Sequence, residues 1–121
     1  MQSRLHRGQI SVLIRVVLGA AAVEFDWDDE NRAHIAAHCV SCAEAEQVVK
    51  NEPFDLEFQT ENGEERFVQL GETNAGRILV VVSTWRKTLI RVITAFDAPK
   101  AMKRIYIVQK GNVYGTDPQG P

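Results

Sequence analysis

The spacing of apolar residues changes at Phe54, and this change constrains the fold of the 121-residue chain more than any other feature. Before it, apolar residues recur at the three- and four-residue spacing of amphipathic helices. After it, Phe54, Leu56 and Phe58 alternate with polar residues, as in a half-buried strand. Asn62-Gly63 follows, and this dipeptide favours a tight hairpin because both residues accept positive φ. The pattern predicts an α+β domain in which helices precede an antiparallel sheet.

Two helix starts can be identified in the first half of the chain. Alternation over residues 23–27 predicts a short strand, after which Asp28 is a candidate N-cap for a helix reaching about His38. Ser41 and Glu44 have the spacing of a capping box, which predicts a second helix that ends before Pro53. The N-terminal part therefore contributes a short strand and two helices.

The second half predicts a four-stranded antiparallel meander followed by a helix. Residues 65–70 return from the hairpin, residues 78–82 are apolar on both faces and hence central, and a turn at Arg86-Lys87 leads into residues 88–95. The last helix, about residues 97–110, is amphipathic. Its predicted core face comprises Ala98, Ala101, Met102, Ile105 and Val108, and its basic face comprises Lys100, Lys103, Arg104 and Lys110, with Ile107 among them.

Charge and composition limit the domain organisation and the compartment. Residues 24–72 hold fourteen acidic and three basic side chains, whereas residues 73–121 hold eight basic and two acidic ones. The basic half favours a polyanionic partner, unless the two halves pair with each other. We expect one domain at 24–110, an extension at 1–23 and a flexible tail at 111–121. The apolar run within the extension resembles a signal peptide, but Arg15 interrupts it. Two cysteines form no disulfide framework, so we expect a cytoplasmic protein without membrane contact.

Four segments in this order resemble the BrnT family of toxins, which belongs to the RelE/ParE-like superfamily: residues 25–28, 34–41 with 44–46, 63–67, and 79–82 with 90–95. The resemblance covers about residues 25–111. It implies a RelE-like fold, a small curved antiparallel sheet with helices on one face. It also implies a type II toxin, a metal-independent endoribonuclease without cofactor that inhibits translation. Its partners are then RNA, a neutralising BrnA-type antitoxin, and operator DNA bound only through the antitoxin complex.

The chain departs from the family pattern at three places. Cys39 stands where members commonly have glycine, Phe96 where many have arginine, and Met102 or Lys103 near a common glutamate. These departures support an alternative, a catalytically degenerate binding module that pairs with an antitoxin or nucleic acid without cleavage.

The predicted catalytic groups are three arginines and two proton-transfer groups. Metal-free RNA cleavage needs cations at the phosphate, and Arg66, Arg86 and Arg91 lie on the predicted meander. Arg91 is expected on one face with Leu89, Ile93 and Ala95, either as a phosphate clamp or in an ion pair with an acid such as Glu65. His38 and Glu65 are the candidates for proton transfer.

The predicted RNA contacts are Lys87, Lys100, Lys103, Arg104 and Tyr106. The basic helix face favours RNA, although a solvated face or an acidic antitoxin surface explains it as well. Tyr106 is expected either to stack on a base or to lie in the core. Cys39 and Cys42 beside two histidines suggest a zinc or thiol site, but no second C-x-x-C accompanies them, and we expect no metal.

Overall fold

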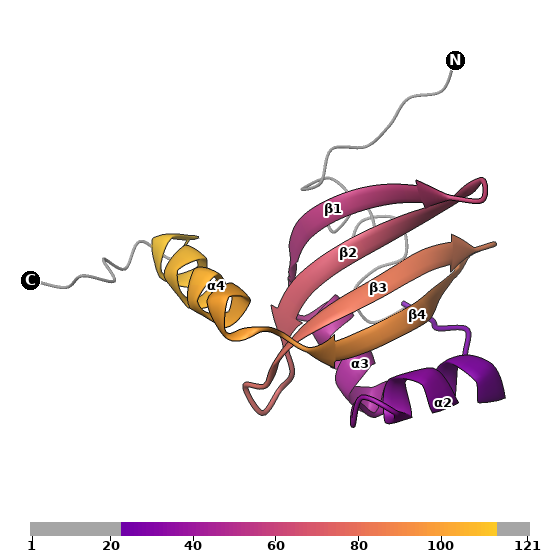
Figure 1. Cartoon of the computed structure of the whole chain (residues 1–121), viewed down its shortest axis with the longest axis horizontal. Coiled ribbons are helices and arrows are strands. Elements are labelled where there is room, and N and C mark those ends of the chain that lie inside the picture. Colours follow the sequence, from indigo (N-terminus) through magenta and orange to yellow (C-terminus); the bar gives the residue numbers. More distant parts are fainter. Residues whose placement is uncertain (1–22, 114–121) are drawn as a thin grey trace, which may run out of the picture.

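The computed structural model describes residues 23–113 and confirms the α+β meander (Figure 1). The strands form one antiparallel sheet in chain order. The expected extension and the tail beyond residue 113 lie outside the described residues, and the last helix continues three residues past its expected end. The elements are α2 (Asp29–Ala36), α3 (Cys42–Lys50), β1 (Phe54–Glu61), β2 (Glu64–Glu72), β3 (Ile78–Arg86), β4 (Leu89–Asp97) and α4 (Lys100–Val113).

Both early helices begin with a capping box. The Asn31 N–H donates to the Asp28 side chain at 3.1 Å, and the Asp28 N–H donates to the Asn31 side chain at 2.8 Å. Ser41 and Glu44 make the same reciprocal pair at 3.1 and 3.0 Å, as predicted. These contacts satisfy N–H groups that have no partner within the helix.

The expected strand at residues 23–27 is not formed as a strand. Only Phe25 makes a bridge, parallel to Ile90 of β4, with backbone hydrogen bonds from Asp26 to Ile90 and from Ile90 to Glu24. The pairing stops after one bridge because Asp28, three residues later, is already the N-cap of α2.

The hairpin turns follow the sequence prediction. Asn62 and Gly63 both have positive φ, 53° and 79°, between β1 and β2. Lys87, with φ 62°, turns β3 into β4. Strand β3 lies between β2 and β4, and Leu79, Val80 and Val81 are buried, as a central strand requires.

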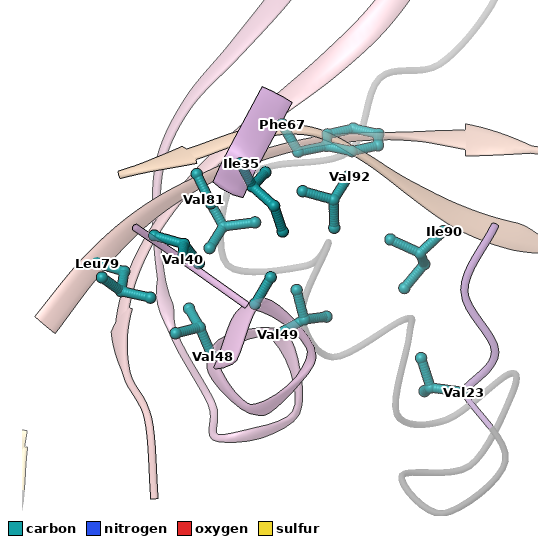
Figure 2. Close-up of a cluster of buried hydrophobic side chains, with 12 residues drawn as sticks. Val23, Ile35, Val40, Val48, Val49, Phe67, Leu79, Val81, Ile90 and Val92 are labelled. Carbon is teal, nitrogen blue, oxygen red and sulfur yellow. The ribbon is translucent and has the colours of Figure 1, made fainter. Parts of the chain in front are cut away.

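Two apolar clusters lie on opposite faces of the sheet. The first joins α2 and α3 to the sheet through residues such as Ile35, Val48 and Val92 (Figure 2). The second contains Leu70 and Tyr106 and joins α4 to the other face. In Figure 1, α4 lies apart from α2 and α3, beyond the end of β4. The expectation that all helices share one face is therefore wrong for α4.

Helix α4 is also rotated relative to the prediction. Tyr106 is only 2% exposed, and its ring lies 5.2 Å from that of Phe54, whereas Ile105 and Val108 are exposed. The Tyr106 hydroxyl donates to Glu72 at 2.8 Å. A buried aromatic ring with a satisfied hydroxyl removes more apolar surface from water than an isoleucine does, so it sets the packed face. The predicted core face at Ala101, Ile105 and Val108 is wrong. Within residues 23–113, no helix has the length and apolar character that crossing a bilayer requires.

Candidate functional site

Arginines from three adjacent strands line one groove on the sheet. Arg66 comes from β2, Arg86 from β3 and Arg91 from β4, and the groove has a volume of about 290 Å³. That volume is near the lower end of small-ligand sites. The other lining residues are Asp28, Glu30, Asn31, His34, Glu64 and Ile93.

Strand alternation explains why these arginines meet. Val80 and Val82 contact the second cluster, so Thr84 and Arg86 continue the same face of β3. Thr84 pairs with Arg91, which places Arg91 on that face as well. A bulge at Ile93 then reverses the alternation, since Val82 pairs with Thr94 while Ser83 pairs with Val92.

The bulge corrects one prediction about the strand. Ala95 lies in the first cluster, on the side of α2 and α3, and does not share a face with Arg91. Ile93 does line the groove with Arg91, as expected.

Arg91 is held by carboxylates from the start of α2. Each of its two terminal nitrogens lies 3.1 Å from a carboxylate oxygen of Asp28. One of them also lies 3.6 Å from Asp26, and the other lies 3.7 Å from Glu30. The hydrogen bond from Arg91 holds the pKa of Asp28 below its ordinary value and raises the pKa of Arg91. The side chain is only 10% exposed. The ion-pair alternative therefore describes Arg91, with Asp28 as the partner instead of Glu65, and the guanidinium is not a free phosphate clamp.

Glu64 joins the other two arginines. Its carboxylate lies 3.4 Å from Arg66 and 3.6 Å from Arg86, and Arg66 also pairs with Glu61 at 3.0 Å. The Nε of Arg66 is buried and has no hydrogen-bond partner among the described residues. The Arg86 side chain is 53% exposed, so it is the most accessible cation of the groove.

The two predicted proton-transfer residues do not line the groove, but close neighbours of both do. Glu65 follows Glu64 on β2 and therefore points to the opposite face. His38 lies beyond the end of α2, and its ring stacks on His34, 6.1 Å away. His34 lies one turn earlier, within α2, and faces the groove. The i, i+4 pair of histidines was visible in the sequence, but nothing in it indicated which one faces the strands.

The predicted RNA contacts do not form one surface. Lys87 lies at the exposed hairpin tip next to Arg86. On α4, Lys103 pairs with Asp97 at 2.9 Å, and Lys110 lies over the rings of Phe54 and Tyr106. Lys103 holds the pKa of Asp97 below its ordinary value. Burial of Tyr106 prevents it from stacking on a base.

The departures at Cys39 and Phe96 have local explanations. Cys39 has φ 61°, a left-handed conformation that glycine adopts most easily, and its carbonyl accepts from Arg77 at 2.8 Å. Phe96 pairs with Val80 and packs in the second cluster, outside the groove lining. Both cysteines are free thiols, and among residues 23–113 no three ligating side chains converge.

Comparison with models of protein families gives a match. Residues 27–101, more than half of the chain, match the family model described as the ribonuclease toxin BrnT of type II toxin–antitoxin systems. No curated protein matches. The matched range contains every residue that lines the groove and ends within the first turn of α4.

Proposed function

Because the chain belongs to the BrnT family of ribonuclease toxins of type II toxin–antitoxin systems, we propose that it cleaves RNA in the arginine-lined groove. The convergence of Arg66, Arg86 and Arg91 from three strands carries this proposal. Guanidinium groups bind phosphate oxygens in pairs and keep their charge at every physiological pH. Arg66 and Arg86 can therefore stabilise the charge that develops on phosphorus without a metal ion.

His34 is the proton acceptor in this scheme. Imidazole changes its charge near neutral pH, which suits it to taking the proton of a ribose 2′-hydroxyl. The 2′-oxygen then attacks the adjacent phosphorus, the bond from phosphorus to the 5′-oxygen breaks, and water protonates the departing oxygen. The products are a 2′,3′-cyclic phosphate and a 5′-hydroxyl.

The remaining groove residues have different tasks. Arg86 and Arg66 contact the phosphate, while Glu64 orients both guanidiniums from 3.4 and 3.6 Å. Arg91 is a positioning residue, because it ties the start of α2 to β4 and thereby places His34. Lys87, beside Arg86, extends the phosphate contact along the strand turn.

A degenerate binding module is the second candidate function. It is favoured by the charge balance of the groove, since Asp28, Glu30 and Glu64 match the three arginines in number. A phosphate must compete with these carboxylates for each guanidinium. Such a module binds RNA or the antitoxin and cuts nothing.

Cleavage by the purified chain in excess EDTA tests the proposal, and the sequence offers matched controls. His34→Ala is compared with His38→Ala, and Glu64→Gln with Glu65→Gln. We expect His34→Ala to slow cleavage by about 10²–10⁴-fold and its control to stay near wild type. Glu64→Gln slows cleavage more than Glu65→Gln does. Intact RNA after incubation with folded wild-type protein overturns the nuclease and supports the binding module. Equal effects of His34→Ala and His38→Ala overturn the assignment of His34.

The family implies an antitoxin partner and an RNA substrate. We further propose that the antitoxin is of the BrnA type, that cleavage inhibits translation in the cytoplasm, and that only the antitoxin complex binds operator DNA. Induction of the chain alone is then expected to stop incorporation of labelled amino acids, and co-induction of a BrnA-type protein to restore it. Protein synthesis that continues during induction contradicts this.

A further inference from the structure

Helix α4 leaves one apolar face uncovered in the described part of the chain. Ala101, Ile105 and Val108 line a shallow groove together with Arg104 and Gln109. Ile105 is 55% exposed and Val108 is 40% exposed. Their i, i+4, i+7 spacing makes a continuous stripe along the helix, which is typical of a binding face and not of scattered surface residues.

The charge along this face is positive only. Residues 100–113 contain four basic side chains and no acidic one. Lys103 and Lys110 contact the body of the protein, as described above. Lys100 and Arg104 are exposed, make no ion pair with another residue of 23–113, and lie next to the apolar stripe on the helical wheel. The face therefore combines aliphatic anchors with unpaired cations.

We propose that this face, α4 residues Ala101, Arg104, Ile105 and Val108, docks an acidic amphipathic helix of the antitoxin. The inference rests on the proposed function only in requiring an antitoxin, which the family implies. An apolar stripe in the partner covers the aliphatic side chains, and flanking carboxylates pair with Lys100 and Arg104, as in helix-in-groove recognition.

Charge separates this occupant from two others. A second copy of the chain brings α4 against α4 and places cations beside cations, which is unfavourable. RNA satisfies Lys100 and Arg104 but leaves the aliphatic stripe in water. Asp97, the last residue of β4, lies about 20 Å along the strand from Arg91, and α4 begins beyond it. The face shares no residue with the arginine-lined groove, so its occupation leaves that groove open.

A synthetic helical peptide serves as the probe. It carries leucine at alternating three- and four-residue spacing and glutamate elsewhere, and a second peptide carries lysine in place of glutamate. Binding of the fluorescently labelled peptides to the full chain is followed by anisotropy. We expect the glutamate peptide to bind saturably and the lysine peptide to bind at least about tenfold more weakly.

Substitutions on α4 locate the binding face. Ile105→Asn combined with Val108→Asn is expected to weaken binding of the glutamate peptide by about tenfold or more. Arg104→Glu is expected to weaken binding of the glutamate peptide and to strengthen binding of the lysine peptide. Ile107→Asn is the matched control, since Ile107 is 62% exposed on the same helix but does not line the groove. Its affinity for the glutamate peptide is expected to stay within about twofold of that of wild type. Far-UV circular dichroism verifies that each variant is folded.

Four outcomes overturn the proposal. They are non-saturable binding, equal affinity for both peptides, an unchanged affinity in the double variant, and a wild-type dimer in sedimentation velocity that the double variant abolishes. RNA cleavage, measured on the same proteins, separates this proposal from the proposed function. Peptide binding without cleavage overturns the proposed nuclease function and supports the docking face. Cleavage without peptide binding overturns the docking face and supports the nuclease function.

Discussion

Replacement of Arg91 by alanine tests whether this residue positions α2 or binds phosphate. The substitution removes the two 3.1 Å contacts to Asp28 and the longer contacts to Asp26 and Glu30. Hydrogen bonds to charged groups contribute about 1.5–3 kcal/mol. Because the Asp28 and Glu30 side chains are largely exposed, water re-solvates them, and we expect a loss near the lower end, about 2 kcal/mol in the free energy of unfolding.

Urea unfolding monitored by tryptophan fluorescence measures this loss. Arg91→Lys keeps the charge but cannot make the paired hydrogen bonds of a guanidinium. Its free energy of unfolding is therefore expected to lie between those of wild type and Arg91→Ala. Arg32→Ala is the control, since Arg32 is an exposed arginine on α2, the helix whose first residues Arg91 contacts. Equal unfolding midpoints for wild type and Arg91→Ala at pH 7 contradict the positioning role.

The pH dependence of the Arg91→Ala effect gives a second test. Arg91 holds the pKa of Asp28 below its ordinary value of 3.8, so the unfolded chain binds this proton more readily than the folded one. The contribution of the Asp28–Arg91 pair to the free energy of unfolding is complete above that ordinary value. It is lost as the pH falls through the pKa of Asp28 in the folded protein. The stability difference between wild type and Arg91→Ala must therefore narrow below about pH 4. A difference that stays constant to pH 3 indicates lost packing only.

Three further substitutions test local features by urea unfolding. Cys39→Gly is expected to stabilise the protein by about 0.5–1 kcal/mol, because glycine adopts φ 61° without the backbone strain of other residues. The stability of Cys39→Ala is expected to stay near that of wild type. Equal stability of the two variants contradicts this. Gly71→Ala places a Cβ 2.9 Å from Pro53 Cβ and 3.2 Å from its Cα, so we expect a loss of about 1–3 kcal/mol, and an unchanged midpoint refutes the close packing. Asn31→Ala removes donors to the carbonyls of Asp26 and Val92 at 3.0 and 2.9 Å and is expected to cost about 2–3 kcal/mol; a cost below that of Arg32→Ala argues against the buried bridge.

Features fixed by contacts within a few residues were predictable from the sequence. The Ser41–Glu44 capping box and the Asn62-Gly63 turn depend on neighbours along the chain, and both are as expected. The central position of β3 follows from its apolar residues on both faces. Local rules therefore predicted the order and type of most elements.

Features fixed by distant contacts were not predictable in detail. The partner of Arg91 is Asp28, 63 positions earlier, and only the packing of α2 at the edge of the sheet brings them together. The rotation of α4 depends on the contact of Tyr106 with Phe54, a residue of β1.

The candidate site illustrates the same limit at one-residue resolution. The three arginines predicted from the sequence line the groove, whereas Glu64 and His34 line it in place of the predicted Glu65 and His38. In a strand, a shift of one residue reverses the face, and the register that decides it comes from pairing with other strands. Residue types were therefore easier to predict than the exact positions that face the groove.

Cleavage by the guanidinium and imidazole groups of the groove, without a metal ion, leaves characteristic RNA ends. These ends are analysed after incubation in excess EDTA with wild type, with Arg86→Ala and with the control Arg32→Ala. We expect 2′,3′-cyclic phosphate and 5′-hydroxyl ends, a rate reduced about 10²–10³-fold in Arg86→Ala, and an unchanged rate in Arg32→Ala. Ends with 3′-hydroxyl and 5′-phosphate, or cleavage that EDTA abolishes, contradict this expectation.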